Sequence, residues 1–78
     1  MLDAVIVGQA IRACRMERHL SQEVVSGLAG IGRTHLCAIE HGVRRPTLET
    51  FFRLAEAMNV APHELTYRIE QAIQSKKT

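Results

Sequence analysis

Residues 21–42 read SQEVVSGLAGIGRTHLCAIEHG, and the glycines and apolar residues in this segment predict the architecture of the chain. Ser21 can begin a short helix, because its hydroxyl can accept hydrogen bonds from the free backbone N–H groups of the first turn. Gly27 and Gly30 bracket the place where this helix is expected to stop, since glycine tolerates the left-handed backbone of a helix end. The pattern therefore predicts one short helix and then a tight turn.

A second helix is predicted from about Arg33 to His41, and Gly42 is expected to end it. Leu36 and Ile39 are spaced as the buried stripe of such a helix. Two short helices joined by a tight turn form a helix-turn-helix, a unit that can present its second helix to the major groove of DNA.

The composition limits the class of fold. A chain of 78 residues makes one small domain, here residues 1–78. Hydrophobic residues make up 46% of the chain and aromatic residues only 4%, so the core must be aliphatic, which suits a helical bundle better than a sandwich or barrel. The net charge is only +2, so nucleic-acid binding has to be argued from the placement of charges rather than from their sum.

The chain has two cysteines, Cys14 and Cys37, and both fall inside predicted helices. Because no secretory signal or membrane-spanning stretch is present, we expect free thiols, no disulfide framework, no membrane partner and a cytoplasmic location. Cys37 and His41 are four residues apart and share a helical face, but no second pair at suitable spacing supports a structural zinc site. We therefore expect no metal and no cofactor.

Three further helices flank the central motif. Asp3 can cap a first helix that runs to about Arg18, and Thr47 can cap a fourth. Pro62 is placed to open a fifth helix that reaches about Gln74, because proline is tolerated at the first helical position. The chain is therefore predicted to be all-α, with five helices.

Residues on both sides of the central motif extend its pattern over roughly residues 7–65. The full set is Ile11, Arg12, Arg15, the LSQE segment at 20–23, Val25, Gly30, Ile31, Leu36, Ile39, Glu40, Gly42, Arg44, the PTL segment at 46–48, Leu54, Ala55 and Val60. Together these residues resemble the XRE-type family of DNA-binding domains found in phage repressors and Cro proteins. The resemblance implies a compact five-helix bundle of the lambda-repressor-like type, with the helix-turn-helix at helices 2 and 3 and double-stranded DNA as the partner. The size and layout also resemble restriction–modification controller proteins.

The third helix is the expected recognition helix, and its outward positions are candidates for base contact. Arg33 and Thr34 point outward from its first turn, and Cys37 and Ala38 lie one turn further on. Arginine can hold the O6 and N7 atoms of guanine with two hydrogen bonds, whereas threonine can bond a base or touch a thymine methyl. Ala38 could make only apolar contact. The alternative for Arg33 is a phosphate contact, which carries no sequence information.

Other roles follow from the resemblance. In the family, the arginine at the Arg15 position pairs with the glutamate at the Glu40 position and ties the first helix to the recognition helix. A planar guanidinium can hold a carboxylate with two hydrogen bonds, and the alternative is two separately solvated side chains. The family also binds DNA phosphates through the glutamine at the start of helix 2 and through the loop after the recognition helix. The predicted phosphate contacts are Gln22, His35, Arg44 and Arg45.

The last helix carries an apolar stripe at helical spacing, formed by Leu65, Ile69 and Ile73. It can pack back on the first helix or form the interface of a homodimer. We favour the dimer interface, on the expectation that a lone domain has little core left to cover the stripe.

The sequence thus predicts a sequence-specific transcriptional regulator that binds an inverted-repeat operator as a homodimer. The alternative is an antitoxin-like module whose main partner is another protein and whose DNA binding is autoregulatory. Nothing in the sequence predicts an enzyme, because there is no paired carboxylate site, no phosphate-binding loop and no Ser/His/Asp grouping, and we name no catalytic residue.

Overall fold

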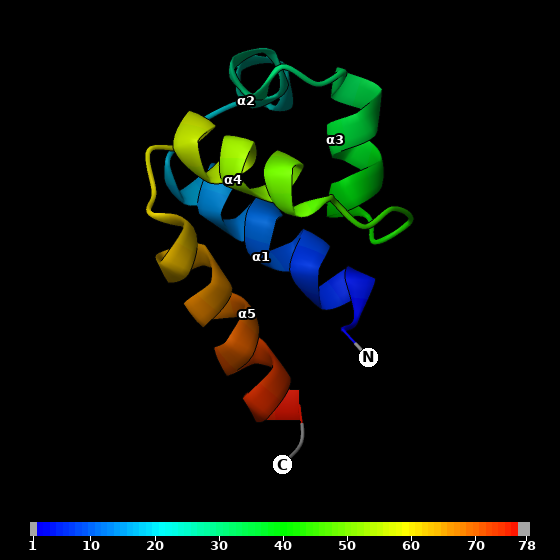
Figure 1. The fold of residues 1–78 in the computed structure, drawn as a ribbon, viewed down its shortest axis with the longest axis vertical. Coiled ribbons are helices and arrows are strands. Elements are labelled where there is room, and N and C mark those ends of the chain that lie inside the picture. The colour runs from blue at the N-terminus through cyan, green and yellow to red at the C-terminus, as the bar shows by residue number, and fades with distance from the viewer. Residues whose placement is uncertain (1, 77–78) are drawn as a thin grey trace.

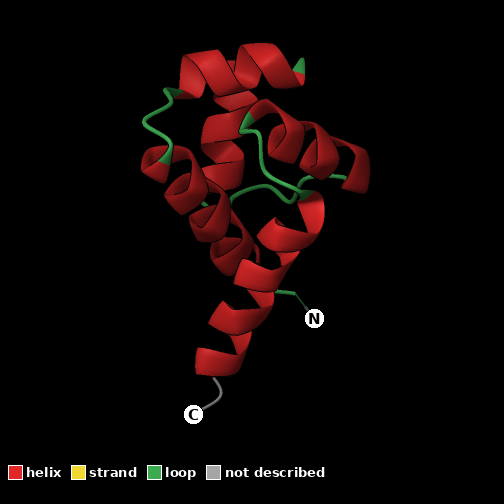
Figure 2. Cartoon of the chain, turned by 90° about the vertical axis from the view of Figure 1, so that its left-hand side faces the viewer, coloured by secondary structure: helices red, strands yellow, loops and turns green. Residues whose placement is uncertain are grey.

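The computed structural model describes residues 2–76, which contain five helices and no strand (Figure 1). The helix α1 runs diagonally through the middle of the bundle, and α2 and α3 lie at one end (Figures 1 and 2). The helix α5 runs alongside α1, and the C-terminal end of α5 extends past the N-terminal end of α1 (Figure 1). The predicted all-α, five-helix architecture is confirmed. The helices are α1 (Ala4–Glu17), α2 (Gln22–Ala29), α3 (Arg33–Glu40), α4 (Leu48–Ala57) and α5 (Pro62–Lys76).

Three helices begin at the side-chain caps that the sequence predicted. The side chains of Asp3, Ser21 and Thr47 each accept a hydrogen bond from a first-turn backbone N–H, at 2.8, 3.0 and 3.1 Å respectively. These bonds satisfy donors that a helix leaves free at its start. Gly32 precedes α3 and offers no side-chain cap, so that helix depends more on tertiary packing.

The helices α1 to α4 all end in the same way. A residue with positive φ donates its N–H to the carbonyl three residues back, and the next residue donates to the carbonyl five residues back. This pattern is the Schellman motif, which satisfies the last free carbonyls of a helix. Gly27 was predicted to help end α2, but it lies inside the helix. The four positive-φ residues are His19, Gly30, Gly42 and Asn59.

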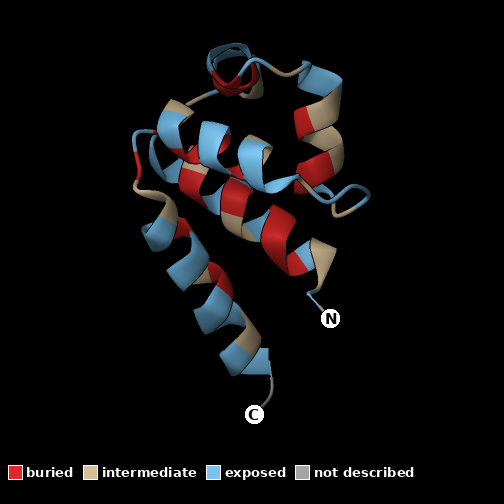
Figure 3. Ribbon diagram, viewed as in Figure 1, coloured by how far each residue is buried: buried red, intermediate tan, exposed pale blue. Residues whose placement is uncertain are grey.

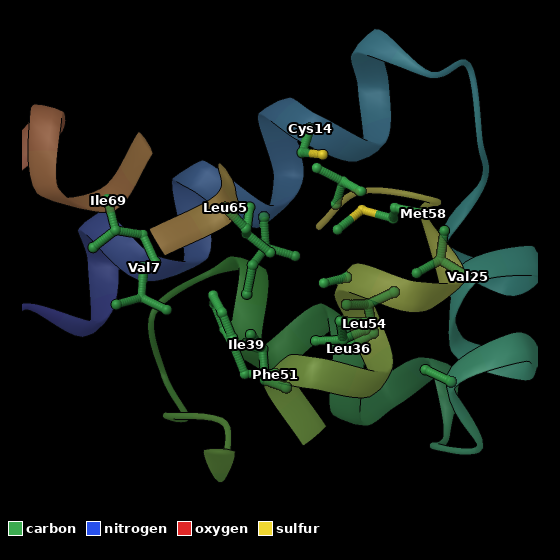
Figure 4. Packing of buried hydrophobic residues seen from close by; sticks show 14 of the residues in the cluster. Val7, Cys14, Val25, Leu36, Ile39, Phe51, Leu54, Met58, Leu65 and Ile69 are labelled. Carbon is green, nitrogen blue, oxygen red and sulfur yellow. The ribbon is translucent and has the colours of Figure 1, made fainter. Parts of the chain in front are cut away.

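Every helix contributes at least one fully buried aliphatic side chain to a single core (Figures 3 and 4). Because the residues come from all five helices, burying them fixes the helices relative to one another, and with them the position of α3. The fully buried set includes Ile11, Val25, Leu36, Leu54 and Leu65.

A glycine sets the closest helix crossing. A Cβ atom on Gly8 of α1 would lie 2.2 Å from the carbonyl oxygen of Ile39 and 2.8 Å from that of Glu40. Real Cβ atoms do not approach backbone oxygens so closely, so only glycine lets α1 lie against the C-terminal end of α3. The sequence pattern did not reveal this role.

The position of α5 corrects one expectation. The apolar stripe of α5 was expected to lack cover within one domain, but it packs against α1 of the same chain. Leu65 is fully buried and Ile69 is only 7% exposed (Figure 4). Ile73 is half-buried at the edge of the core, and the helix continues to Lys76, beyond the predicted end near Gln74. Burial of the stripe therefore stabilises the fold of the single chain, without a second subunit. None of the described helices has the length and apolar character needed to span a membrane.

Candidate nucleic-acid interface

The outer face of α3 collects the residues predicted to contact bases. Arg33 and Thr34 are exposed in its first turn, and Cys37 and Ala38 are half-buried one turn later. The opposite face is anchored by fully buried aliphatic side chains. The four predicted residues line one shallow hollow on the surface, together with His41 and Val43. The helix therefore presents a defined surface that a ligand can reach.

A buried ionic network holds α3 in place from behind. The Arg15 guanidinium donates to both carboxylate oxygens of Glu40, with N–O distances of 2.7 and 2.9 Å. The Glu40 side chain is fully buried and that of Arg15 is 12% exposed. A third N–H of Arg15 donates to the carbonyl oxygen of Leu20 at 2.9 Å, so the guanidinium is also fixed to the loop between α1 and α2. The bond to Glu40 raises the pKa of Arg15, which keeps its charge at any working pH.

Gln22 joins this network from the first residue of α2. Its amide donates to Glu40 Oε1 at 3.0 Å, so one carboxylate links α1, α2 and α3. An amide nitrogen carries two hydrogens, and the second remains able to bond a phosphate oxygen. Bracing α3 and binding phosphate are therefore compatible roles for Gln22.

The two arginines in the loop after α3 differ in their hydrogen-bond partners. The exposed Arg44 side chain makes no hydrogen bond or ion pair with another residue in the range 2–76. Arg45 instead donates to the backbone carbonyl oxygen of Leu2 at 3.0 Å, which fastens the loop to the N-terminal segment. His35, the remaining predicted phosphate contact, is half-buried on the side of α3. Arg44 is therefore better placed than Arg45 to bind an external anion.

Cys37 lies in the C-terminal half of α3, and His41 is the residue that directly follows this helix. The His41 Nδ1 atom is 2.8 Å from the carbonyl oxygen of Cys37 and 3.6 Å from its sulfur, and both cysteines of the chain are free thiols. Within residues 2–76, the side chains do not bring three His, Cys, Asp or Glu residues together as metal ligands. The first contact holds the imidazole against the last turn of the helix.

A family model described as helix-turn-helix matches residues 11–65. The chain belongs to the XRE-type helix-turn-helix family. This is a family of DNA-binding regulators, not of enzymes, and the resemblance seen in the sequence is confirmed. The matched range contains the whole of α2, α3 and α4.

Individual relatives agree with the family. The chain is 37% identical over 60 residues to the uncharacterized HTH-type transcriptional regulator y4dJ of Sinorhizobium fredii, covering 77% of this chain and 78% of that protein. It is 33% identical to the control protein C.SmaI of Serratia marcescens, covering 81% of this chain and 75% of the relative. The crystal structure of the restriction–modification controller protein C.AhdI from Aeromonas hydrophila superposes with a TM-score of 0.78 at 35% identity, covering 83% of this chain and 98% of that one.

Sequence reasoning missed two residues that shape this surface. Gly8 sets the distance between α1 and α3, and Val43 lines the hollow beside Ala38. Val43 carried a weak signal, since an aliphatic residue stands between Gly42 and two arginines in a loop. Gly8 carried none, because the partner that it touches is more than thirty positions away in the chain.

Proposed function

We propose that this protein is a sequence-specific transcriptional regulator that binds an inverted-repeat operator as a homodimer. The observation that carries the proposal is the outer face of α3, where Arg33 and Thr34 are exposed while the buried Arg15–Glu40 pair fixes the helix from behind. A preformed, rigid helix with donors at its N-terminal turn suits entry into a major groove.

The contacts divide into two kinds. Arg33 is proposed to bond guanine O6 and N7, and Thr34 to bond or touch the neighbouring base. Arg44 and Gln22 are proposed to bind phosphates on either side, which positions α3 but supplies no sequence preference. His35 and Arg45 remain proposed phosphate contacts, and the bond from Arg45 to the Leu2 carbonyl limits the positions that its guanidinium can take at the DNA.

A groove supports the proposed dimer. It has a volume of about 540 Å³ and lies between the N-terminal segment, the start of α4 and α5. Leu48, the first residue of α4, is 73% exposed at this groove, and Ile73 lines it from α5. A second copy can cover these side chains, since a two-fold contact uses the same patch twice. Because Leu65 and Ile69 are already buried in the monomer, we place the interface at this groove, with Ile73 and the exposed edge of Ile69 contributing.

Two linked half-site contacts then reinforce each other, and the two copies of α3 would enter successive major grooves about 34 Å apart. The regulatory effect follows from occupancy: a dimer bound near a promoter blocks or recruits polymerase. The relatives support a regulatory role, because their names describe a transcriptional regulator and a control protein.

A binding selection from a random DNA library tests the DNA-binding proposal. We expect an enriched inverted repeat whose half-site centres are about one helical turn apart. Selection without an enriched motif would contradict sequence-specific binding, and an enriched single half-site would contradict the dimer.

Leu48→Glu tests the interface without threatening the fold, because a carboxylate in the first turn of a helix interacts favourably with the helix dipole. We expect this variant to be monomeric in analytical ultracentrifugation across micromolar concentrations and to lose operator affinity while keeping half-site affinity. The matched control is Leu28→Glu on α2, where the side chain is 69% exposed and does not line the groove. If the wild-type protein stays monomeric, or if the Leu48→Glu variant is dimeric, the proposed interface is wrong.

A further inference from the structure

The four Schellman helix ends differ in one respect. Each is followed by an apolar residue, and this residue usually packs under its helix end. Val60 is buried in the core, and Leu20 and Ile31 are half-buried against it. Val43, the equivalent residue after α3, is 81% exposed. The Schellman end of α3 therefore determines where the backbone of Val43 lies, but it leaves the Val43 side chain exposed to solvent.

Val43 is held in a fixed position even though it is exposed. The Ala38 carbonyl accepts hydrogen bonds from the backbone N–H groups of Val43 and Arg44, at 3.0 and 3.3 Å. Gly42 turns the chain with φ of 74°, and its Cα lies so close to Val5 of α1 that an added Cβ would be 2.7 Å from a Val5 methyl. The loop is thus bonded to α3 on one side and packed against α1 on the other.

Val43 and Ala38 provide the apolar part of the hollow on the outer face of α3, and Thr34 and Cys37 line it as well. Neither Val43 nor Ala38 has a side-chain donor or acceptor, so these two residues cannot recognise the amino group of cytosine or adenine. An exposed C5-methyl group is the one apolar feature that a base pair presents in the major groove, and it belongs to thymine.

We propose that this hollow receives the C5-methyl group of a thymine in each operator half-site, with Val43 as a specificity-determining residue. The inference rests on the proposed DNA-binding function and names what this part of the surface recognises. Charge supports DNA as the occupant, because Arg33 lines the hollow and Arg44 directly follows Val43 in the chain, and the residues that line the hollow include no carboxylate.

Uracil-containing operators test the proposal with a change of one methyl group. After the operator has been selected, each thymine of the half-site is replaced by uracil at both symmetric positions. We expect one position at which affinity falls about fourfold per half-site, or roughly 16-fold for the dimer, the size expected for losing one buried methyl. Placing cytosine or 5-methylcytosine at that position gives an independent comparison, in which the methylated base should bind about fourfold more tightly per half-site.

Variants of Val43 identify the residue that contacts the methyl. Val43→Ser should lower affinity for the thymine operator and bring the thymine-to-uracil affinity ratio close to one. Because Val43 is exposed, the fold should survive, and circular dichroism melting checks this. Leu28→Ser is the matched control, since Leu28 is 69% exposed on α2 and does not line the hollow, and it should keep the wild-type ratio.

The outcomes separate the two proposals. If an operator is selected but no thymine position responds to uracil, the hollow does not bind a methyl and only this inference fails. If the ratio persists in Val43→Ser, another side chain contacts the methyl and the role of Val43 is refuted. If Val43→Ser changes self-association without DNA, the hollow binds protein and the inference is overturned. If no operator is selected, the proposed function itself fails.

Discussion

The Arg15 guanidinium holds the buried Glu40 carboxylate through two hydrogen bonds, 2.7 and 2.9 Å long, and this pair connects α1 to the last turn of α3. Such a pair fixes geometry more reliably than it adds net stability, because both charges had to leave water. Removing only one partner should destabilise the fold, because the charge of the other partner then stays buried without compensation.

Glu40→Ala and Arg15→Ala should each lower the free energy of unfolding by about 3 kcal/mol. The double variant should be clearly less destabilised than the sum of the two, because it leaves no unpaired charge. Urea denaturation of the four proteins gives the coupling energy, for which we expect at least about 1 kcal/mol. Additive effects would mean that the pair does not act as a unit.

Gly8→Ala should destabilise the domain by about 3 kcal/mol or more, because the new methyl meets two backbone carbonyl oxygens of α3 that cannot move independently. Thermal or urea unfolding measures the change. Gly27→Ala is the matched control: an added Cβ there meets nothing within 4 Å, and alanine in a helix interior should stabilise by about 0.5–1 kcal/mol. Equal effects at the two glycines would contradict the close crossing of α1 and α3.

Arg33→Ala should weaken operator binding by roughly 1–3 kcal/mol and relax the base preference at one position of each half-site. Repeating the library selection with the variant reveals the lost preference. Should affinity fall equally on operator and random DNA, Arg33 would contact phosphate alone.

Arg44→Ala should reduce the salt dependence of DNA affinity more than Arg45→Ala does. The Arg44 side chain has no hydrogen-bond or ion-pair partner within residues 2–76, so its removal should reduce the slope of log K against log salt by about 0.9, the value for one phosphate contact. Arg45 is engaged with the Leu2 carbonyl, so its removal should change the slope less. Fluorescence anisotropy titrations between 50 and 200 mM salt, a range over which phosphate contacts change affinity by orders of magnitude, make the comparison. A larger change for Arg45 would reverse this assignment.

The Glu17–Arg68 pair should make stability depend on pH. Hydrogen bonding to Arg68 lowers the pKa of Glu17 below its ordinary value, so the unfolded chain takes up this proton first as the pH falls. The stabilisation is therefore present above the ordinary glutamate pKa of about 4.3 and is lost as the pH drops through the lowered value.

Glu17→Gln should accordingly be less stable than wild type at pH 7 and equal to it in acid, which urea midpoints at several pH values can show. Glu56→Gln is the control, because Glu56 is exposed and forms no ion pair in the described part of the chain. A stability difference for Glu17→Gln that stays constant with pH would show that the ion pair is not its cause.

Features that depend on near neighbours along the chain could be predicted from the sequence. Asp3, Ser21 and Thr47 bond N–H groups two or three residues away, so their capping roles are visible in the local sequence. The apolar faces of α3 follow from helical periodicity, and the outward placement of Arg33 follows with them. The Arg15–Glu40 pair spans 25 positions and could be anticipated only through the family resemblance.

Features that depend on how helices cross were decided by the tertiary structure. The sequence favoured a second subunit as the cover for the stripe on α5, but whether Leu65 is covered depends on α1 lying beside it, which no pattern within α5 encodes. Val43 and Val60 occupy the same position after their helix ends, yet one faces solvent and the other the core. Local hydrogen bonds shape both ends alike. Only the elements packed around each end determine whether the apolar side chain is buried or exposed.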